Sequence, residues 1–225
     1  MDERIRSILT LRGGAQSVNV GRSGASVLRS EGLYLKIAPR GSLERAAAMQ
    51  RYFARKGFAR APLAFEQSEE RDYLLTESMP GKAGIEWLEQ PRWLAARLGE
   101  AVRALHETEA WDCPIDDVNQ QALTLFCQHT GREFEAGAIL RKDALVHGDC
   151  CLPNVFLDAT GVVGFIDLGE GGLGDRHFDL FWSLWSLKYN LKTERYGERF
   201  LDAYGRDALD RERLDCCTRL SGTGG

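Results

Sequence analysis

The sequence predicts an α+β fold with two lobes, a small antiparallel β lobe over residues 1–80 and a mainly helical lobe over residues 81–225. The first part of the chain contains alternating apolar and polar runs, which are typical of half-buried strands. Most of the second part carries apolar residues at helical spacing. Between the two parts, the Pro-Gly pair in "ESMPG" interrupts regular structure and marks the expected boundary.

A β-hairpin is predicted at the start of the first lobe. The runs Ser26–Leu28 and Leu33–Ile37 alternate in polarity and are joined by the turn "RSEG". In the second run the leucine and isoleucine side chains point to one face, and those of Tyr34 and Lys36 point to the other.

One helix and one further strand complete the predicted first lobe. The segment "SLERAAAMQRYFARKG" is rich in helix formers, with Ser42 as the expected N-cap and Gly57 as the expected stop. The segment "DYLLTESMPG" reads as a strand that runs into the Pro-Gly boundary.

The second lobe is predicted to be helical, with two short strands inside it. "PRWLAARLGEAVRALHE" has Trp93, Leu94, Leu98, Val102 and Leu105 at helical spacing, and "DRHFDLFWSLWSLKYN" and "TERYGERFLDAYG" give further helices. Between them, "LVHGD" and "VVGFID" are short apolar runs that read as buried strands, each ending in an aspartate.

Composition excludes several classes of protein. The 225 residues are 44% hydrophobic, which is enough to bury a real core. The net charge of −4 argues against a nucleic-acid partner and suits a cationic or neutral ligand. No apolar run approaches the roughly 18 residues of a membrane span. The N-terminal "MDERIRSILTLRGG" lacks a secretory apolar region, so we expect a cytoplasmic protein.

The cysteines are predicted to be reduced thiols. All six lack metal-site spacing, and Cys150-Cys151 and Cys216-Cys217 are adjacent pairs, which bridge only with difficulty. A nucleophilic role for Cys150 or Cys151 is the alternative, but it would leave the neighbouring aspartate and asparagine unexplained.

The stretch "LVHGDCCLPNVFLDATGVVGFIDLG" concentrates side chains suited to phosphoryl transfer. Asp149 and Asp167 each follow a predicted strand, and Asn154 lies between them. Carboxylate and amide oxygens are ligands that suit Mg²⁺, and a further carboxylate can accept the proton of an attacking hydroxyl. Together with Lys36 on an early strand, this set indicates transfer of a phosphoryl group from a nucleotide.

These segments resemble the aminoglycoside O-phosphotransferases, a family with a protein-kinase-like fold. "HGDCCLPN" and "GFIDLG" are similar to the family's catalytic and metal segments, and the interval from Asp149 to Asp167 (167 − 149 = 18) is that of the family. The segments "GRSGASV", "LYLKI", "LHETEAWDCP" and "GDRHFDLFWSL" resemble further family motifs in the same order. The resemblance covers most of the chain.

The resemblance implies a role for each matching residue. Asp149 would be the catalytic base, Asn154 and Asp167 the Mg²⁺ ligands, Lys36 a phosphate contact and Ser23 a contact to the β-phosphate of ATP, with GTP as the alternative donor. The structural alternatives are a turn role for Asp149 and Asn154, a solvated strand lysine at Lys36, and an ordinary hairpin at Ser23.

Two further residues of these motifs are expected to brace the catalytic loop. His147 would bond backbone groups instead of transferring protons, and Asp179 matches a position whose partners would be groups of the catalytic loop.

Several positions depart from the family pattern. The glutamate that pairs with the phosphate-binding lysine would fall at Ala46, whereas the available acid is Glu44, about 200° away around a helix. Glu44 therefore either pairs with Lys36 after a shift or favours the helix N-terminus through its charge. The segment from Cys113 to His147 is short, with room for about one helix.

The substrate side of the pattern also differs. Glu170 stands where the family commonly has arginine, and the chain ends in "TRLSGTGG" instead of an acidic, aromatic tail. Glu170 is the expected contact to a cationic acceptor.

We therefore expect a monomeric, ATP-dependent kinase that phosphorylates a hydroxyl of a cationic aminoglycoside and confers antibiotic resistance. One alternative is a kinase of another hydroxylated small molecule. The other is a nucleotide-binding protein without transfer activity, against which the complete set of Asp149, Asn154 and Asp167 argues.

Overall fold

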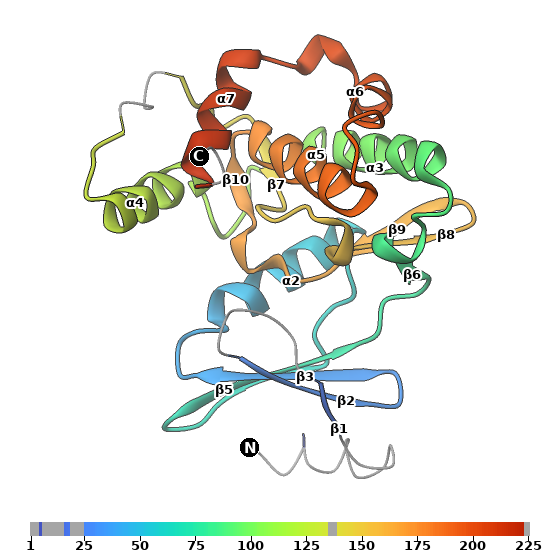
Figure 1. Cartoon of the computed structure of the whole chain (residues 1–225). Helices are drawn as coiled ribbons and strands as arrows, with labels where there is room; N and C mark the ends of the chain where they lie inside the picture. Colours follow the sequence, from blue (N-terminus) through green and yellow to red (C-terminus); the bar gives the residue numbers. More distant parts are fainter. Residues whose placement is uncertain (1–4, 6–15, 19–24, 135–138, 223–225) are drawn as a thin grey trace. The chain divides into compact units, whose positions relative to one another are not determined.

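The computed structural model describes residues 5, 16–18, 25–134 and 139–222 (Figure 1). The chain divides into two compact units, Met1–Met79 and Pro80–Gly225. Each unit builds its own elements, and each is described separately below.

The first unit contains a five-stranded antiparallel sheet in the order β1-β2-β3-β5-β4. The predicted hairpin is confirmed, with strands longer than expected, because the pairing of β2 with β3 extends to Ser30 and Leu33. β3 is bonded on both sides, by β2 and by β5. The strands are β1 (Gln16–Val18), β2 (Ser26–Ser30), β3 (Leu33–Pro39), β4 (Ala64–Gln67) and β5 (Arg71–Glu77).

The predicted helix of this unit, α2 (Glu44–Arg55), begins later than the sequence predicts. Ser42 is not the N-cap, so that prediction was wrong: the cap is Leu43, and its side chain makes no capping hydrogen bond. Instead, the Leu43 backbone N–H donates to Oδ2 of buried Asp72, a residue of β5, at 2.8 Å. A carboxylate from the sheet therefore satisfies one donor that a local cap would otherwise serve.

The second unit is mainly helical. The predicted helices are confirmed, and none of the described helices is long and apolar enough to cross a membrane. The helices are α3 (Pro91–His106), α4 (Val118–Thr130), α5 (His177–Leu191), α6 (Gly197–Tyr204) and α7 (Arg211–Leu220), with short 3₁₀ turns η1 (Gly84–Glu86), η2 (Leu152–Asn154), η3 (Leu168–Glu170) and η4 (Arg206–Ala208).

The prediction of two short strands in this unit was incomplete. The described residues form five strands in two antiparallel sheets, β10-β7 and β6-β8-β9, so the two predicted strands, β7 and β9, belong to different sheets. The strands are β6 (Lys82–Ala83), β7 (Ala144–Val146), β8 (Val155–Asp158), β9 (Gly161–Phe165) and β10 (Gly172–Gly174).

A buried aspartate fixes the start of α5 relative to the start of α7. Asp175 Oδ1 accepts hydrogen bonds from the backbone N–H and Nδ1 of His177, at 2.9 and 2.8 Å, and its Oδ2 accepts one from Arg213 Nε at 2.8 Å. Burial alone would raise the pKa of Asp175, but the bonds from His177 and Arg213 more than offset it and lower this pKa to about 2. The carboxylate is therefore ionised at neutral pH and holds both helices.

Helix α3 forms the centre of the second unit. Leu94, Leu98, Val102 and Leu105 are fully buried, as their helical spacing predicts. Gly99 faces α6, and a Cβ atom at this position would overlap the backbone oxygen of Phe200 and lie 2.9 Å from the backbone nitrogen of Tyr204. The two helices thus approach closely because position 99 has no side chain.

Replacing Gly99 by Ala is expected to destabilise the protein. In an exposed helix the change would stabilise by roughly 1 kcal/mol, but overpacking against backbone costs about 1–3 kcal/mol, so we expect a net loss of up to about 2 kcal/mol. Urea unfolding followed by circular dichroism measures it. Gly197→Ala is the matched control, because its Cβ would meet only the flexible Cδ2 of Leu184 at 3.2 Å. Equal stability of the two variants would contradict the packing argument.

Candidate active site

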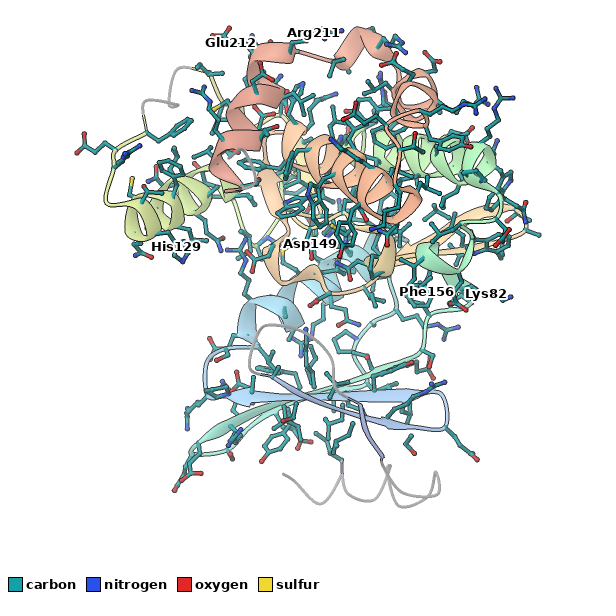
Figure 2. All side chains as sticks on the ribbon, viewed as in Figure 1. Lys82, His129, Asp149, Phe156, Arg211 and Glu212 are labelled. Atoms are coloured by element: carbon teal, nitrogen blue, oxygen red, sulfur yellow. The ribbon has the colours of Figure 1, made fainter. Side chains whose placement is uncertain are left out.

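A closed ring of hydrogen bonds joins two of the predicted site residues of the second unit, Asp149 and Asn154, to His147 and Ile166. His147 Nε2 bonds the Ile166 carbonyl oxygen at 3.0 Å, and the Ile166 N–H donates to the Asn154 carbonyl oxygen at 2.9 Å. Asn154 Nδ2 donates to the backbone oxygen of Asp149 at 3.0 Å and to its Oδ2 at 2.9 Å. The Asp149 N–H closes the ring on His147 Nδ1 at 3.2 Å. Figure 2 labels Asp149 in the helical unit. Asp149 and Asn154 are therefore held in direct contact, and Asp167 is the next residue after Ile166.

The partners of His147 assign its tautomer. The Ile166 oxygen can only accept, so Nε2 carries the ring hydrogen, and Nδ1 is then the acceptor for the Asp149 N–H. Both ring nitrogens are committed to backbone groups, and the residue is fully buried. The prediction that His147 braces the loop is confirmed.

Asp179 holds the loop from α5. Its Oδ2 accepts from the His147 N–H at 2.7 Å and its Oδ1 from the Gly148 N–H at 2.8 Å, as its predicted bracing role requires. Oδ2 also contacts His106 Nε2 at 3.1 Å, and His106 Nδ1 bonds the Tyr204 hydroxyl at 2.9 Å. Burial raises the pKa of Tyr204 to about 12, so its hydroxyl stays protonated. The loop is thus connected to α3 and α6 through a buried polar network.

Gly148 is required by its conformation and by its surroundings. Its φ is +83°, and a Cβ would overlap the backbone oxygen of Glu170 and lie 2.7 Å from the Glu170 carbonyl carbon. A side chain at this position would therefore push apart the loop that carries Asp149 and the turn that follows Asp167.

Asp167 has a left-handed backbone, with φ 58° and ψ 55°, at the start of η3. This conformation is uncommon for a residue with a side chain, and such residues concentrate at functional sites. The side chain is exposed, whereas Phe165, the last residue of β9, is buried. The backbone therefore turns sharply after the strand and presents the carboxylate outward.

Sequence reasoning missed the serines of α5 that support the loop. Ser183 Oγ donates to the Cys150 carbonyl oxygen at 3.2 Å, and the Leu152 N–H donates to Ser186 Oγ at 2.9 Å. Both serines are buried, which their place among the aromatic residues of "LFWSLWSL" suggests in retrospect.

The cysteines are free thiols, as predicted. Burial raises the pKa of the Cys150 thiol well above its usual range, and burial together with the charge of Asp149 raises the pKa of Cys151. Neither group forms a thiolate at neutral pH, so the alternative of a cysteine nucleophile loses its chemical basis.

The donor set fits Mg²⁺. The Asn154 amide nitrogen is committed to Asp149, and among the described residues the amide oxygen accepts no hydrogen bond, which leaves it for a hard cation. No cluster of three or more His, Cys, Asp or Glu side chains suited to a metal occurs in the described part of the chain. A divalent ion here would therefore take Asn154, Asp167 and further oxygens from phosphates and water.

The remaining predicted site residues belong to the first unit. Lys36 is half-buried in β3, opposite Val27 of β2 and Leu74 of β5. Glu44 stands in the first turn of α2, and its Oε1 accepts from Gln67 Nε2 at 2.8 Å. Ser23 lies outside the described residues.

The short segment before the catalytic loop contains one helix, α4, as expected. Its Gln121 Nε2 donates to Glu170 Oε2 at 3.2 Å, so the helix is bonded to the turn that follows Asp167. Glu170 is exposed beside this turn.

Comparison with known proteins agrees with this geometry. The model of the phosphotransferase enzyme family matches residues 14–215. A probable aminoglycoside 3'-phosphotransferase of Lactococcus lactis subsp. lactis (strain IL1403) is 38% identical over 216 residues, covering 84% of this chain and 82% of that protein. An aminoglycoside 3'-phosphotransferase of Streptomyces fradiae is 30% identical over 243 residues, covering 88% and 90%.

Solved structures show the same fold. The crystal structure of an aminoglycoside-3'-phosphotransferase of type VIII is similar with a TM-score of 0.75 at 26% identity, covering 98% of both chains. The predicted α+β, protein-kinase-like fold and the predicted phosphotransferase class are confirmed. With its loop of Asp149, Asn154 and Asp167 and its match over nearly the whole length, the chain belongs to the phosphotransferase enzyme family.

Proposed function

We propose that this enzyme transfers the γ-phosphoryl group of ATP to a hydroxyl of an aminoglycoside antibiotic and thereby confers resistance. The observation that carries the proposal is the closed hydrogen-bond ring that fixes Asp149 against Asn154 and next to Asp167. The names of the relatives, at 38% and 30% identity, support the acceptor class.

In this proposal the chain's residues divide the work. Asp149 accepts the proton of the acceptor hydroxyl as that oxygen bonds the γ-phosphorus and the bond to the leaving nucleoside diphosphate breaks. Asn154 and Asp167 hold Mg²⁺, which neutralises charge on the phosphates. Lys36 contacts the phosphates, so the nucleotide-binding role falls to residues 1–80 and the catalytic and metal loops to residues 81–225.

The position of Asp149 suits a base. Its Oδ2 is fixed by the Asn154 amide, while its backbone is fixed by His147. Because one side-chain oxygen and the backbone are already held, the carboxylate is preorganised to orient the hydroxyl.

Glu170 is the residue proposed to contact the acceptor. Aminoglycosides carry several ammonium groups, and a carboxylate beside the metal turn complements them. The bond from Gln121 orients this carboxylate from α4, and Glu170 stands where arginine is common in the family. We assign Glu170 as the contact to an acceptor ammonium group.

The short segment before the loop supports a second candidate, a kinase of another hydroxylated small molecule. The one helix described between Cys113 and His147 is α4, so the acceptor wall is small. The catalytic residues would keep the same roles with that acceptor.

Nucleoside diphosphate release by the purified protein tests both candidates. Kanamycin-type aminoglycosides and unrelated amino alcohols would be supplied in turn, with ATP or GTP, in Mg²⁺ or in EDTA. Aminoglycoside-dependent, Mg²⁺-dependent turnover is expected with ATP. Turnover with amino alcohols alone would favour the second candidate. Nucleotide binding without any acceptor-stimulated release of nucleoside diphosphate would contradict the proposal.

A further inference from the structure

A cavity of the helical unit is lined by arginines. It has a volume of about 540 Å³ and lies between the first two turns of α3 and the start of α6. Four arginines form its wall. Arg92 and Arg97 belong to α3, Arg199 belongs to α6, and Arg195 precedes α6 by two residues. None of Asp149, Asn154 or Asp167 lines it, so the cavity is separate from the candidate active site.

The acidic residues of the wall are already paired. Arg206 Nη2 bonds Glu198 at 2.6 Å and Arg206 Nε bonds Asp202 at 2.6 Å. Arg206 therefore neutralises much of the negative charge that would otherwise oppose the four arginines.

The four arginines make few ion pairs with carboxylates of the described residues. Arg92 and Arg199 have no carboxylate partner among the described residues. Arg97 Nη1 bonds Glu100 at 2.8 Å, but its Nε is buried without a hydrogen-bond partner within the described part of the chain. A buried guanidinium N–H that lacks an acceptor is costly, and an anion in the cavity would supply one.

The two helices add to this positive potential. α3 and α6 lie side by side (Figure 1). Beyond the cavity, Gly99 faces Phe200, and further along both helices Arg103 bonds the Tyr204 oxygen, so the two helices run in the same direction away from the cavity. Both helices therefore begin at the cavity. Neither N-cap side chain makes a capping bond. Pro91 has no N–H and the Gly197 N–H donates to the Glu194 oxygen, so the N–H groups that follow them in each first turn are the ones left for an anion.

We propose that this cavity binds a small anion carrying two linked phosphoryl groups. Guanidinium groups from two sides match phosphate oxygens in bidentate geometry, and the volume exceeds the need of a single phosphate. The ligand is either free diphosphate or the diphosphate of a nucleotide, held at a site that takes no part in phosphoryl transfer.

Isothermal titration of the full-length protein with pyrophosphate tests the proposal. EDTA is included so that metal-dependent phosphate binding near Asn154 and Asp167 is removed. The variant is Arg195→Ala/Arg199→Ala, and both residues are exposed, so folding should persist. The matched control, Arg71→Ala/Arg132→Ala, removes the same charge from exposed sites outside the cavity.

We expect wild type and control to bind pyrophosphate equally, and the cavity variant to bind at least about tenfold more weakly. A second titration with ADP distinguishes the two sources of the ligand. If ADP binding weakens in the cavity variant as much as pyrophosphate binding does, the ligand is a nucleotide. If only pyrophosphate binds at the cavity, the ligand is free diphosphate. The proposal is overturned by undetectable binding to wild type, by equal loss in the control, or by an unchanged cavity variant.

Discussion

The variant Asp149→Asn is expected to lower kcat for aminoglycoside phosphorylation by about 10²–10⁴-fold, the usual contribution of a general base. The amide oxygen of the new side chain can still accept from Asn154 Nδ2, so the hydrogen-bond ring is expected to survive. Loss of rate would then report loss of the proton acceptor and not collapse of the loop. Steady-state kinetics with saturating ATP and acceptor measure the effect.

The control for this variant is Asp215→Asn, an equivalent change at an exposed position of α7. Its kcat should equal that of the wild type, and all three proteins should unfold at the same temperature. If the Asp149 variant kept a tenth or more of wild-type kcat, the role of general base would have to be withdrawn.

The variant Asp179→Asn should show the largest loss of stability. Three donors converge on this fully buried carboxylate: the N–H groups of His147 and Gly148, and His106 Nε2. An amide turns one of its ends into a donor, so at least one of these groups loses its acceptor in the core. We expect a loss of about 3 kcal/mol in the free energy of unfolding, measured by urea denaturation.

Asp116→Asn supplies the comparison, because its side chain is 82% exposed. A change of no more than about 0.5 kcal/mol is expected there. Because Asp179 holds the catalytic loop, its variant should also lose activity at temperatures where it remains folded. An Asp179 variant as stable as the Asp116 variant would show that the buried network contributes nothing to folding.

Elements with strong local patterns could be predicted from the sequence. α3 and β3 bury most of the residues that their periodicity selects, such as Leu94 and Leu98 in one case and Leu33 and Leu35 in the other, while Trp93 and Ile37 are half-buried. β10 could not be predicted, because Gly172–Gly174 has no strand propensity and pairs only because β7 offers a partner edge. The prediction of Ser42 as the N-cap of α2 was wrong for a similar reason. The carboxylate that accepts from the Leu43 N–H belongs to Asp72 of β5, which is distant in the sequence.

The candidate site divides in the same way. The order Asp149, Asn154, Asp167 is visible in the sequence, as is the bracing aspartate Asp179. The ring that joins Asp149 to Asn154 runs partly through the N–H and carbonyl of Ile166, and backbone groups carry no signal in a sequence. His106 and Tyr204 were also missed as supports, since their contact joins helices 98 residues apart along the chain.

The buried cysteine pair beside the catalytic loop has a consequence for inhibitor design. Cys151 follows Asp149 by two residues, which would make it an attractive anchor for an electrophilic drug. Its pKa, however, is raised by burial and by the neighbouring carboxylate, and the thiol does not reach the reactive anionic form at physiological pH. Compounds that rely on covalent capture at Cys151 would find no reactive thiolate there, so a blocker aimed at this loop would have to gain its affinity from reversible contacts.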